Sequence, residues 1–148
     1  MAHWTIDISK YAEKKGKEIK DIRRAYAFAL YASIVKKTPV DTGRARGNWN
    51  ISVGKVDSST DDNRKGIRYK GTGDVPNPNG DESIFISNNL PYIETLEYGG
   101  YPNPPKGGKG KTVNGFSKQA PNGMVGVTLA NNENIFNAAV KAVKGSKE

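Results

Sequence analysis

The chain has 148 residues, of which 35% are hydrophobic, with 17 Gly and 8 Pro. This length is typical of one compact domain, and the low apolar fraction with about one Gly or Pro in six residues argues against a dense helical bundle. Lys and Arg number 23 against 15 Asp and Glu, a formal charge of +8, which favours an anionic partner such as nucleic acid, anionic lipid or an acidic protein. The absence of cysteine excludes disulfides and thiolate sites.

The sequence predicts no membrane association. No apolar run approaches the roughly 20 residues of a membrane span, and the N-terminus lacks the apolar stretch of a signal peptide. We therefore expect a soluble protein that is made in the cytosol.

The first predicted element is a long helix over residues 7–37. Apolar side chains recur there at helical spacing, and residues 25–35 are apolar almost all round, which predicts burial on several sides. Pro39 ends the helix because it disfavours helical backbone at the residue before it. The segment from Lys10 to Lys37 carries nine basic and three acidic residues, so this helix is the main basic surface that the sequence predicts.

Two short strands are predicted after a turn. Residues 41–43 (Asp-Thr-Gly) have the composition of a turn. Residues 49–54 alternate apolar and polar side chains, the period of a half-buried strand, and residues 84–86 (Ile-Phe-Ile) form a second strand candidate. The polar connection 57–82 is a long loop, within which residues 67–70 could form a short extra strand.

The remainder of the chain predicts two helices and a second loop. Pro91 to Tyr98 is typical of a short helix that Gly99 ends, and residues 99–118 form a loop rich in Gly, Pro and Lys. Asn122 is placed to cap a C-terminal helix that runs to about Lys144. We therefore predict a single α+β domain over residues 1–148, in which long N-terminal and C-terminal helices pack on a small antiparallel sheet, with a short middle helix and two extended loops.

Motifs for catalysis, metals and cofactors are weak in this chain. The segment Gly110-Lys111-Thr112 lacks the earlier glycine of a phosphate-binding loop, because Pro105 stands at that position, and no strand precedes it. The only histidine is His3, and the acidic pairs 61–62 and 81–82 lie in polar loops without the spacing of a calcium site. No serine has a nucleophile-elbow context. The sequence therefore predicts no enzymatic activity, no cofactor and no metal.

Charged residues around the middle helix and the loops are the better candidates for binding. Glu94 and Glu97 are three residues apart on the short helix, where they would share a face as an acidic patch for a Lys or Arg partner, or as a carboxylate pair. Arg44 and Arg46 would project on one side of an extended segment after the turn, and Glu97 is placed to form an ion pair with such an arginine, within one subunit or between two. The further basic candidates lie in the second loop: Lys106, Lys109, Lys111 and Lys118.

Nucleic-acid binding is a second interpretation of the same charges. The basic helix and the lysine-rich segment 106–118 could bind phosphates and release counterions. The sequence contains no zinc ligands, no aromatic ribonucleoprotein motif and no helix-turn-helix spacing. No recognised nucleic-acid-binding module therefore accompanies the charge.

Three segments together resemble the tail-completion, or neck, proteins of long-tailed bacteriophages. The segment TPVDTGRARGNW (38–49) follows a long helix and is similar to the junction of that family. YIETLEYGGYP (92–102) is similar to its short helix, and SKQAPNGMVGVTLANNENIF (117–136) to the start of its last helix. The order and spacing of all three match, so the resemblance covers nearly the whole chain.

The resemblance implies a non-enzymatic structural virion protein. Such proteins form a ring, commonly sixfold, that joins the head-side connector to the tail tube and leaves a channel for DNA. The implied partners are other copies of the chain, the adjacent connector or stopper, tail terminator or tube proteins, and genomic DNA in the channel. The implied location is the neck or tail of a virion, after synthesis in the host cytoplasm. A tail terminator or another minor tail component is an alternative, and we expect loops 57–82 and 99–118 to act as arms that reach the next ring.

Overall fold

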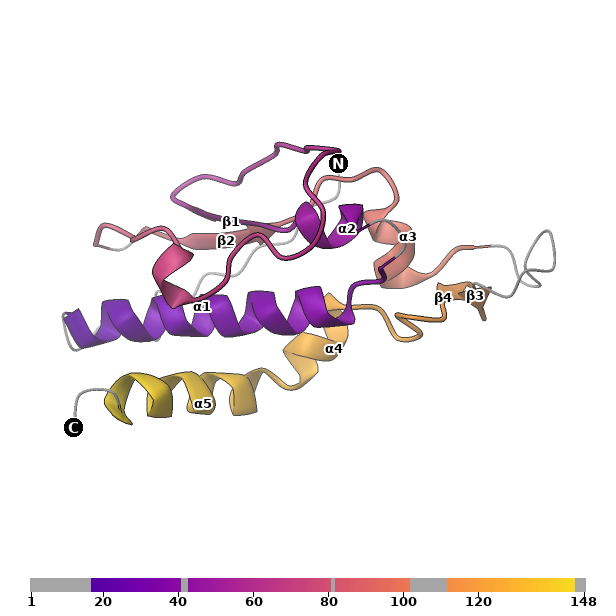
Figure 1. Cartoon of the computed structure of the whole chain (residues 1–148). Helices are drawn as coiled ribbons and strands as arrows, with labels where there is room; N and C mark the ends of the chain where they lie inside the picture. Colours follow the sequence, from indigo (N-terminus) through magenta and orange to yellow (C-terminus); the bar gives the residue numbers. More distant parts are fainter. Residues whose placement is uncertain (1–16, 41–42, 81, 102–111, 146–148) are drawn as a thin grey trace.

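The structure is a computed structural model that describes residues 17–40, 43–80, 82–101 and 112–145. It has the predicted α+β class, with a long helix near the start, a C-terminal helix and short antiparallel strands (Figure 1). The elements in chain order are α1 (Lys17–Lys37), α2 (Arg44–Gly47), β1 (Asn50–Val53), η2 (Thr72–Asp74), β2 (Ile84–Ser87), α3 (Ile93–Tyr98), β3 (Thr112–Val113), β4 (Phe116–Ser117), α4 (Val125–Ala130) and α5 (Asn132–Gly145).

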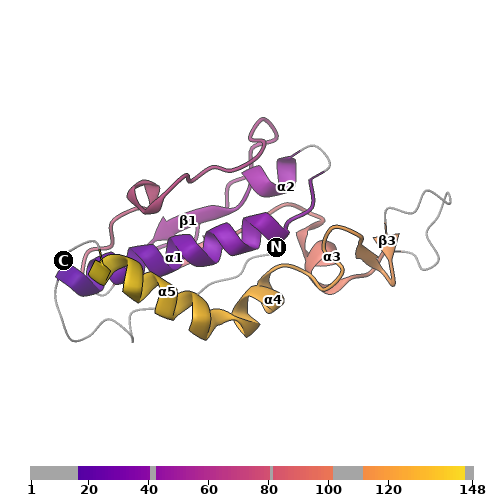
Figure 2. The same ribbon diagram turned by 60° about the horizontal axis from the view of Figure 1, so that its bottom comes forward.

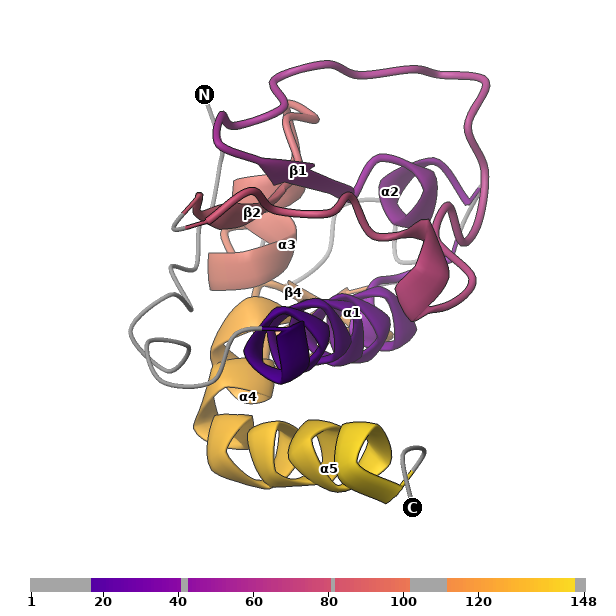
Figure 3. The ribbon, with the colours of Figure 1, turned by 90° about the vertical axis from the view of Figure 1, so that its left-hand side faces the viewer.

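Helix α1 forms the middle layer of the molecule. The strands β1 and β2 lie on one side of it and α5 on the other, so α1 separates the C-terminal helix from the sheet (Figures 1 and 3). The core side chains of α1 that are at most 3% exposed include Tyr26, Leu30, Tyr31 and Ile34. Tyr26 contacts Phe136 of α5, whereas Tyr31 contacts Tyr69 of the loop 57–82. Burial on several sides, which the apolar stretch 25–35 predicted, is thereby confirmed.

The sheet beside α1 consists of the two predicted strands. Strands β1 and β2 are antiparallel, with Asn50 opposite Ser87 and Val53 opposite Ile84. Ile84 and Ile86 turn toward the core and are each 1% exposed. The alternation after Trp49 and the apolar run Ile84-Phe85-Ile86 thus placed the two strands correctly.

The C-terminal helical region is divided into two helices. Helix α4 ends at Ala130, and the backbone of the next residue, Asn131, leaves helical geometry. Helix α5 then begins at Asn132, whose side chain accepts a hydrogen bond from the Tyr26 hydroxyl. Along α5, Phe136 stacks edge-on against Tyr26 with ring centroids 5.2 Å apart. The prediction of one continuous helix capped by Asn122 is wrong, because the chain turns at Asn131 to place α5 along α1 (Figure 2).

The segment between α1 and β1 forms a single helical turn, α2. Gly43 adopts a left-handed backbone conformation (φ 83°), and its carbonyl accepts the N–H of Gly47, which closes the single turn of α2. Gly47 is packed so closely that a Cβ there would lie 2.3 Å from the carbonyl oxygen of Arg64. The condition under which Arg44 and Arg46 would project on one side, an extended chain, is therefore not met.

The described part of loop 57–82 is tied back to its own chain by side chains of α1 and β1. The Tyr31 hydroxyl accepts the backbone N–H groups of Arg68 (2.9 Å) and Tyr69 (3.2 Å). Tyr69 is itself buried, and its hydroxyl accepts the N–H of Ile51 (3.0 Å) and donates to the Ile51 carbonyl (3.1 Å). A strand over residues 67–70 does not form, because a tyrosine hydroxyl takes the place of a third strand beside β1.

Two arginines of α1 hold the second half of the same loop. Arg24 donates to the carbonyls of Thr72 (3.2 Å) and Val75 (2.7 Å), which fixes the 3-10 turn η2. Arg23, only 4% exposed, donates to the carbonyls of Gly80 and Glu82. These bonds attach the loop to α1, which argues against an arm that projects freely to another ring.

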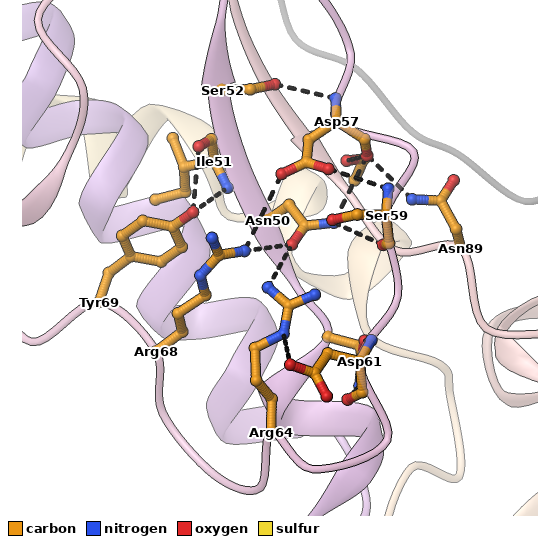
Figure 4. A network of polar contacts seen from close by, with 12 residues as sticks. Asn50, Ile51, Ser52, Asp57, Ser59, Asp61, Arg64, Arg68, Tyr69 and Asn89 are labelled. Carbon is orange, nitrogen blue, oxygen red and sulfur yellow. Dashed lines mark hydrogen bonds and ion pairs between the residues drawn. The ribbon is translucent and has the colours of Figure 1, made fainter.

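A polar network fastens the first half of the loop to β1 (Figure 4). Asn50 is fully buried, accepts hydrogen bonds from the guanidinium groups of Arg64 and Arg68, and donates to the Asp57 carbonyl. Burial raises the pKa of the Asp57 carboxyl, but hydrogen bonds from Ser59 and the charge of Arg68 outweigh this effect and hold the pKa below its ordinary value. The network thus holds the first half of the loop against β1 through side chains of the same chain.

A hairpin lies within the second predicted loop. Strands β3 and β4 pair through Thr112 opposite Ser117, and the turn between them is Asn114-Gly115, both with positive φ. This dipeptide is a strong signal for a two-residue hairpin turn, although the prediction treated it only as part of a loop.

Candidate interaction site

The three segments on which the family resemblance rests meet at one corner of the molecule. The end of α1 with α2, the helix α3, and the segment from β4 into α4 lie side by side there (Figure 1). Side-chain contacts join them, among them those from Glu97 to the start of α4 and from Gln119 to Val40. Residues far apart in the sequence thereby form one continuous structure.

Glu97 fastens α3 to the first turn of α4. Its Oε1 accepts the N–H groups of Met124 (2.8 Å) and Val125 (2.7 Å), and its Oε2 accepts the N–H of Gly126 (2.9 Å). The first N–H groups of a helix have no partner within the helix, and a carboxylate is favoured there by the helix dipole. Glu97 therefore performs the capping role that the sequence assigned to Asn122.

Two predictions for Glu97 are wrong for this reason. Both of its oxygens face α4, so it does not pair within the subunit with Arg44, which instead pairs with Asp62 (2.6 Å). It also does not form a surface patch with Glu94, because Glu94 is exposed to solvent while Glu97 turns toward α4.

Gly123 allows the approach of α3 to α4. It has a positive φ of 80°, and a Cβ at this position would lie 2.4 Å from the carbonyl oxygen of Glu97. Gln119 fixes the other side of the corner, where its side-chain amide accepts the N–H of Val40 (2.7 Å) and donates to the Val40 carbonyl (3.1 Å). Several residues of the three family-like segments therefore have a structural role, which is to hold this corner together.

A cleft of about 680 Å³ opens at this corner. Its walls include two aromatic rings, Tyr92 and Tyr101, and two cationic side chains, Arg44 and Lys118. The Arg44 guanidinium carbon lies 5.7 Å from the centre of the Tyr92 ring, within the range of a cation–π contact.

The chemistry of the cleft is suited to binding. Burial raises the pKa of the Tyr92 hydroxyl despite the opposing charge of Arg44, so this hydroxyl is neutral at physiological pH. Arginine and tyrosine are the residue types that dominate binding energy in protein interfaces. Lys118 and Arg44, the latter also paired with Asp62 (2.6 Å), lie beside neutral aromatic rings, an arrangement that matches an acidic segment that also carries apolar groups.

The other predicted site residues lie elsewhere. Arg46 does not share the side of Arg44, because its guanidinium donates to the carbonyls of Thr38 (2.8 Å) and Lys36 (3.1 Å) at the end of α1. This arrangement suits the unpaired carbonyls of a helix C-terminus. The three lysines of the second loop fall outside the described residues: Lys106, Lys109 and Lys111.

Sequence reasoning missed the aromatic walls of the cleft. Tyr92 stands inside the resembling segment 92–102, but nothing local indicates that it would lie under Arg44. Tyr101 reaches the cleft because its N–H bonds the Gly115 carbonyl (3.0 Å) of the hairpin turn. Both positions depend on contacts between distant segments.

Within the described ranges, no group of three or more His, Asp or Glu side chains is placed to hold a metal ion. The helices in that part of the chain are also too short or too polar to cross a membrane. Comparison with protein-family models, with characterised proteins and with solved structures found no match.

Proposed function

We propose that this chain is a structural, non-enzymatic virion protein that forms part of the ring joining a phage head connector to the tail tube. The observation that carries the proposal is the meeting of the three family-like segments at one corner. There, Glu97, Gln119 and Gly123 fix the backbone and leave Arg44 and Lys118 at an open cleft. In this proposal, the cleft receives an acidic segment of an adjacent protein of the neck or tail.

The rigidity of the corner supports an assembly role. A binding surface costs less to dock when its groups are already ordered. Glu97 accepts three backbone N–H groups at the start of α4, and Gln119 binds both backbone groups of Val40, so the segments that carry the cleft are held together within the chain. A tail terminator or another minor tail component would use the same surface, and both belong to this proposal as variants of it.

Nucleic-acid binding ranks second. Three arginines that contribute to the basic charge, Arg23, Arg24 and Arg46, donate to carbonyls of their own chain. Their donors are therefore partly occupied, whereas a phosphate-binding surface needs them directed outward. This observation favours a protein partner over DNA as the main ligand of the described surface.

The proposal is tested by deletion of the coding sequence from its phage genome, followed by electron microscopy of the products. We expect filled heads and tails that do not join, with joining restored by the wild-type chain supplied in trans. The variant Arg44→Glu/Lys118→Glu should fail to restore it, while the control Lys55→Glu, at an exposed position after β1, should succeed. Normal joined particles without the chain would refute the proposal.

A separate measurement addresses the nucleic-acid alternative. Fluorescence anisotropy with duplex DNA at low salt should show tight binding and a steep decline with salt concentration if phosphates are the ligand. Absence of binding at low salt would remove this alternative.

A further inference from the structure

A second groove lies between α1 and the segment 67–70. It has a volume of about 590 Å³, and its walls include Phe28, Tyr31 and Tyr69. Ile67 also lines it and is 59% exposed, although it is a large aliphatic side chain. The groove is therefore an apolar surface that the described part of the chain leaves open to solvent.

The rim of this groove is cationic. Lys36 and Lys70 line it and are both exposed. Asp74, an acidic residue of the same loop, accepts the backbone N–H of Lys70 with its carboxylate (2.8 Å). The Asp74 carboxylate is thus engaged by the loop itself, and a partner of this groove should combine an apolar side chain with negative charge.

Helix α3 carries such a pair of side chains on its outer face. Glu94 and Tyr98 are four residues apart on the helix and so lie one above the other. Tyr98 is 75% exposed, the largest value among the exposed large hydrophobic side chains described, and Glu94 is exposed as well. The opposite side of α3 is used inside the molecule, where Leu96 is buried and Glu97 caps α4.

The two surfaces lie on different sides of the molecule. Viewed along α1, helix α3 is on one side and the chain around η2 is on the other (Figure 3). One copy cannot bring its own α3 face to its own groove, whereas a neighbouring copy can. A contact between two different surfaces of identical chains is head-to-tail, and repetition of such a contact closes into a ring or extends as a filament.

We propose that the Glu94–Tyr98 face of α3 docks into the Ile67 groove of the next copy of this chain. The Tyr98 ring enters the apolar groove, and the Glu94 carboxylate faces Lys36 and Lys70. A volume near 590 Å³ falls within the range that encloses a bound side chain or small ligand, and a tyrosine buries about 150–250 Å² of its surface in such a contact. The inference rests on the proposed function, because it names the contact between copies within the ring.

A reciprocal charge swap tests the pairing. Glu94→Lys alone places a lysine against the basic rim of the next copy, and Lys36→Glu/Lys70→Glu places two acids against Glu94. We expect each variant alone to associate at least tenfold more weakly than the wild type in sedimentation velocity. An equimolar mixture should regain association, because every contact in an alternating ring is then complementary. Lys55→Glu is the matched control and should associate like the wild type.

Removal of the Tyr98 ring provides a second variant. Tyr98→Ala should raise the dissociation constant between copies about thirtyfold, the size of effect found when an interface anchor is truncated. The changed side chains are all exposed, so circular dichroism should show an unchanged fold. Unaltered association of Tyr98→Ala would overturn the proposal, as would a mixture of charge variants that stays dissociated.

Crosslinking establishes whether the contact is head-to-tail. The chain has no cysteine, so Tyr98→Cys and Ile67→Cys introduce the only thiols. With a short bis-maleimide, the double variant should yield a ladder of oligomers, and a mixture of the two single variants should stop at dimers. Efficient dimers from Tyr98→Cys alone would indicate a symmetric contact and overturn the proposal, as would the absence of any ladder.

These outcomes separate the contact from the proposed function. If gene deletion leaves heads and tails unjoined but the charge swap has no effect on association, the contact is refuted and the neck role is supported. If the charge swap restores association as expected but heads and tails join without the chain, the neck role is refuted and the contact is supported.

Discussion

Replacement of Glu97 by alanine is the most direct test of how this corner is built. The carboxylate accepts the N–H groups of Met124, Val125 and Gly126 at 2.7–2.9 Å. These amides begin α4 and have no helical acceptor of their own. The Met124 N–H belongs to a fully buried residue, so water cannot easily replace its lost acceptor.

The expected cost follows from the number of bonds and their burial. A hydrogen bond to a charged group contributes about 1.5–3 kcal/mol, and a buried donor left without a partner costs about 1–3 kcal/mol. Gly126 is exposed, so water can serve its N–H in the variant. We therefore expect Glu97→Ala to lower the free energy of unfolding by about 2–4 kcal/mol.

Glu97→Gln separates geometry from charge. The remaining carbonyl oxygen can still accept the N–H groups of Met124 and Val125, whereas the bond from Gly126 and the negative charge are lost. A charge near a helix N-terminus contributes about 0.3–1 kcal/mol. We expect a loss of about 1 kcal/mol for this variant, intermediate between alanine and the wild type.

The assay is urea unfolding followed by circular dichroism, with thermal unfolding alongside. For a chain of this size, each kcal/mol should lower the melting temperature by about 2–4 °C. Glu94→Ala, on the exposed side of the same helix, is the matched control and should change stability by less than about 0.5 kcal/mol. Equal stability of Glu97→Ala and Glu94→Ala would refute the capping role.

Three further predictions test other parts of the structure. Tyr69→Phe removes the hydroxyl that pairs with both backbone groups of Ile51, and urea unfolding should show a loss of about 1–3 kcal/mol. Gly123→Ala should be more destabilising in the same assay than Gly66→Ala, since both positions have positive φ but only Gly123 would place its Cβ 2.4 Å from a carbonyl oxygen; equal losses would contradict the close contact. The folded-state pKa of Asp57 lies below its ordinary value of 3.8, so its ionisation stabilises the fold above that pH and the benefit is lost as pH falls through the lower folded value. The stability difference between wild type and Asp57→Asn should accordingly shrink between pH 6 and pH 3, and a constant difference across this range would contradict the shift.

The helices and strands that could be predicted are those in which several neighbouring residues show the same hydrophobic pattern. The apolar stretch 25–35 specifies the buried part of α1, and the alternation after Trp49 specifies β1. Pro39 and Gly99 mark ends that the structure reproduces at Lys37 and Tyr98. In each case several neighbouring residues favour the same local conformation, so no distant contact was needed to decide it.

The predictions that failed depended on a partner far away in the sequence. Asn122 is a residue type that commonly caps helices, yet α4 starts after Met124. The side chain that binds the first N–H groups there is Glu97, which lies 27 residues before Met124 in the sequence. Residues 67–70 have alternating character, yet Tyr31 binds their backbone groups 37 and 38 residues away. A local sequence pattern cannot identify such partners, because the contact forms only when the fold brings two distant segments together.

The basic charge of the chain does not by itself indicate a surface for an anionic partner, because many of its arginines bind groups of the same chain. Arginine presents several donors in a planar fork, whereas lysine presents a compact charge on a flexible stem. The guanidinium groups of Arg23, Arg24 and Arg46 donate hydrogen bonds to backbone carbonyls. The guanidinium group of Arg68 donates to the side chain of the buried Asn50. Much of the arginine content therefore stabilises loops and a helix end.

The cations at the two grooves are few and lie beside aromatic rings, and one of them, Arg44, is also paired with Asp62 (2.6 Å). Lys118 and Arg44 border the corner cleft, and Lys36 and Lys70 border the Ile67 groove. A surface for phosphates needs a row of outward cations, whereas a surface for an acidic protein segment needs a few cations next to apolar area. The two grooves have the second arrangement, and this is the physical reason to look for their partners among proteins, copies of this chain included.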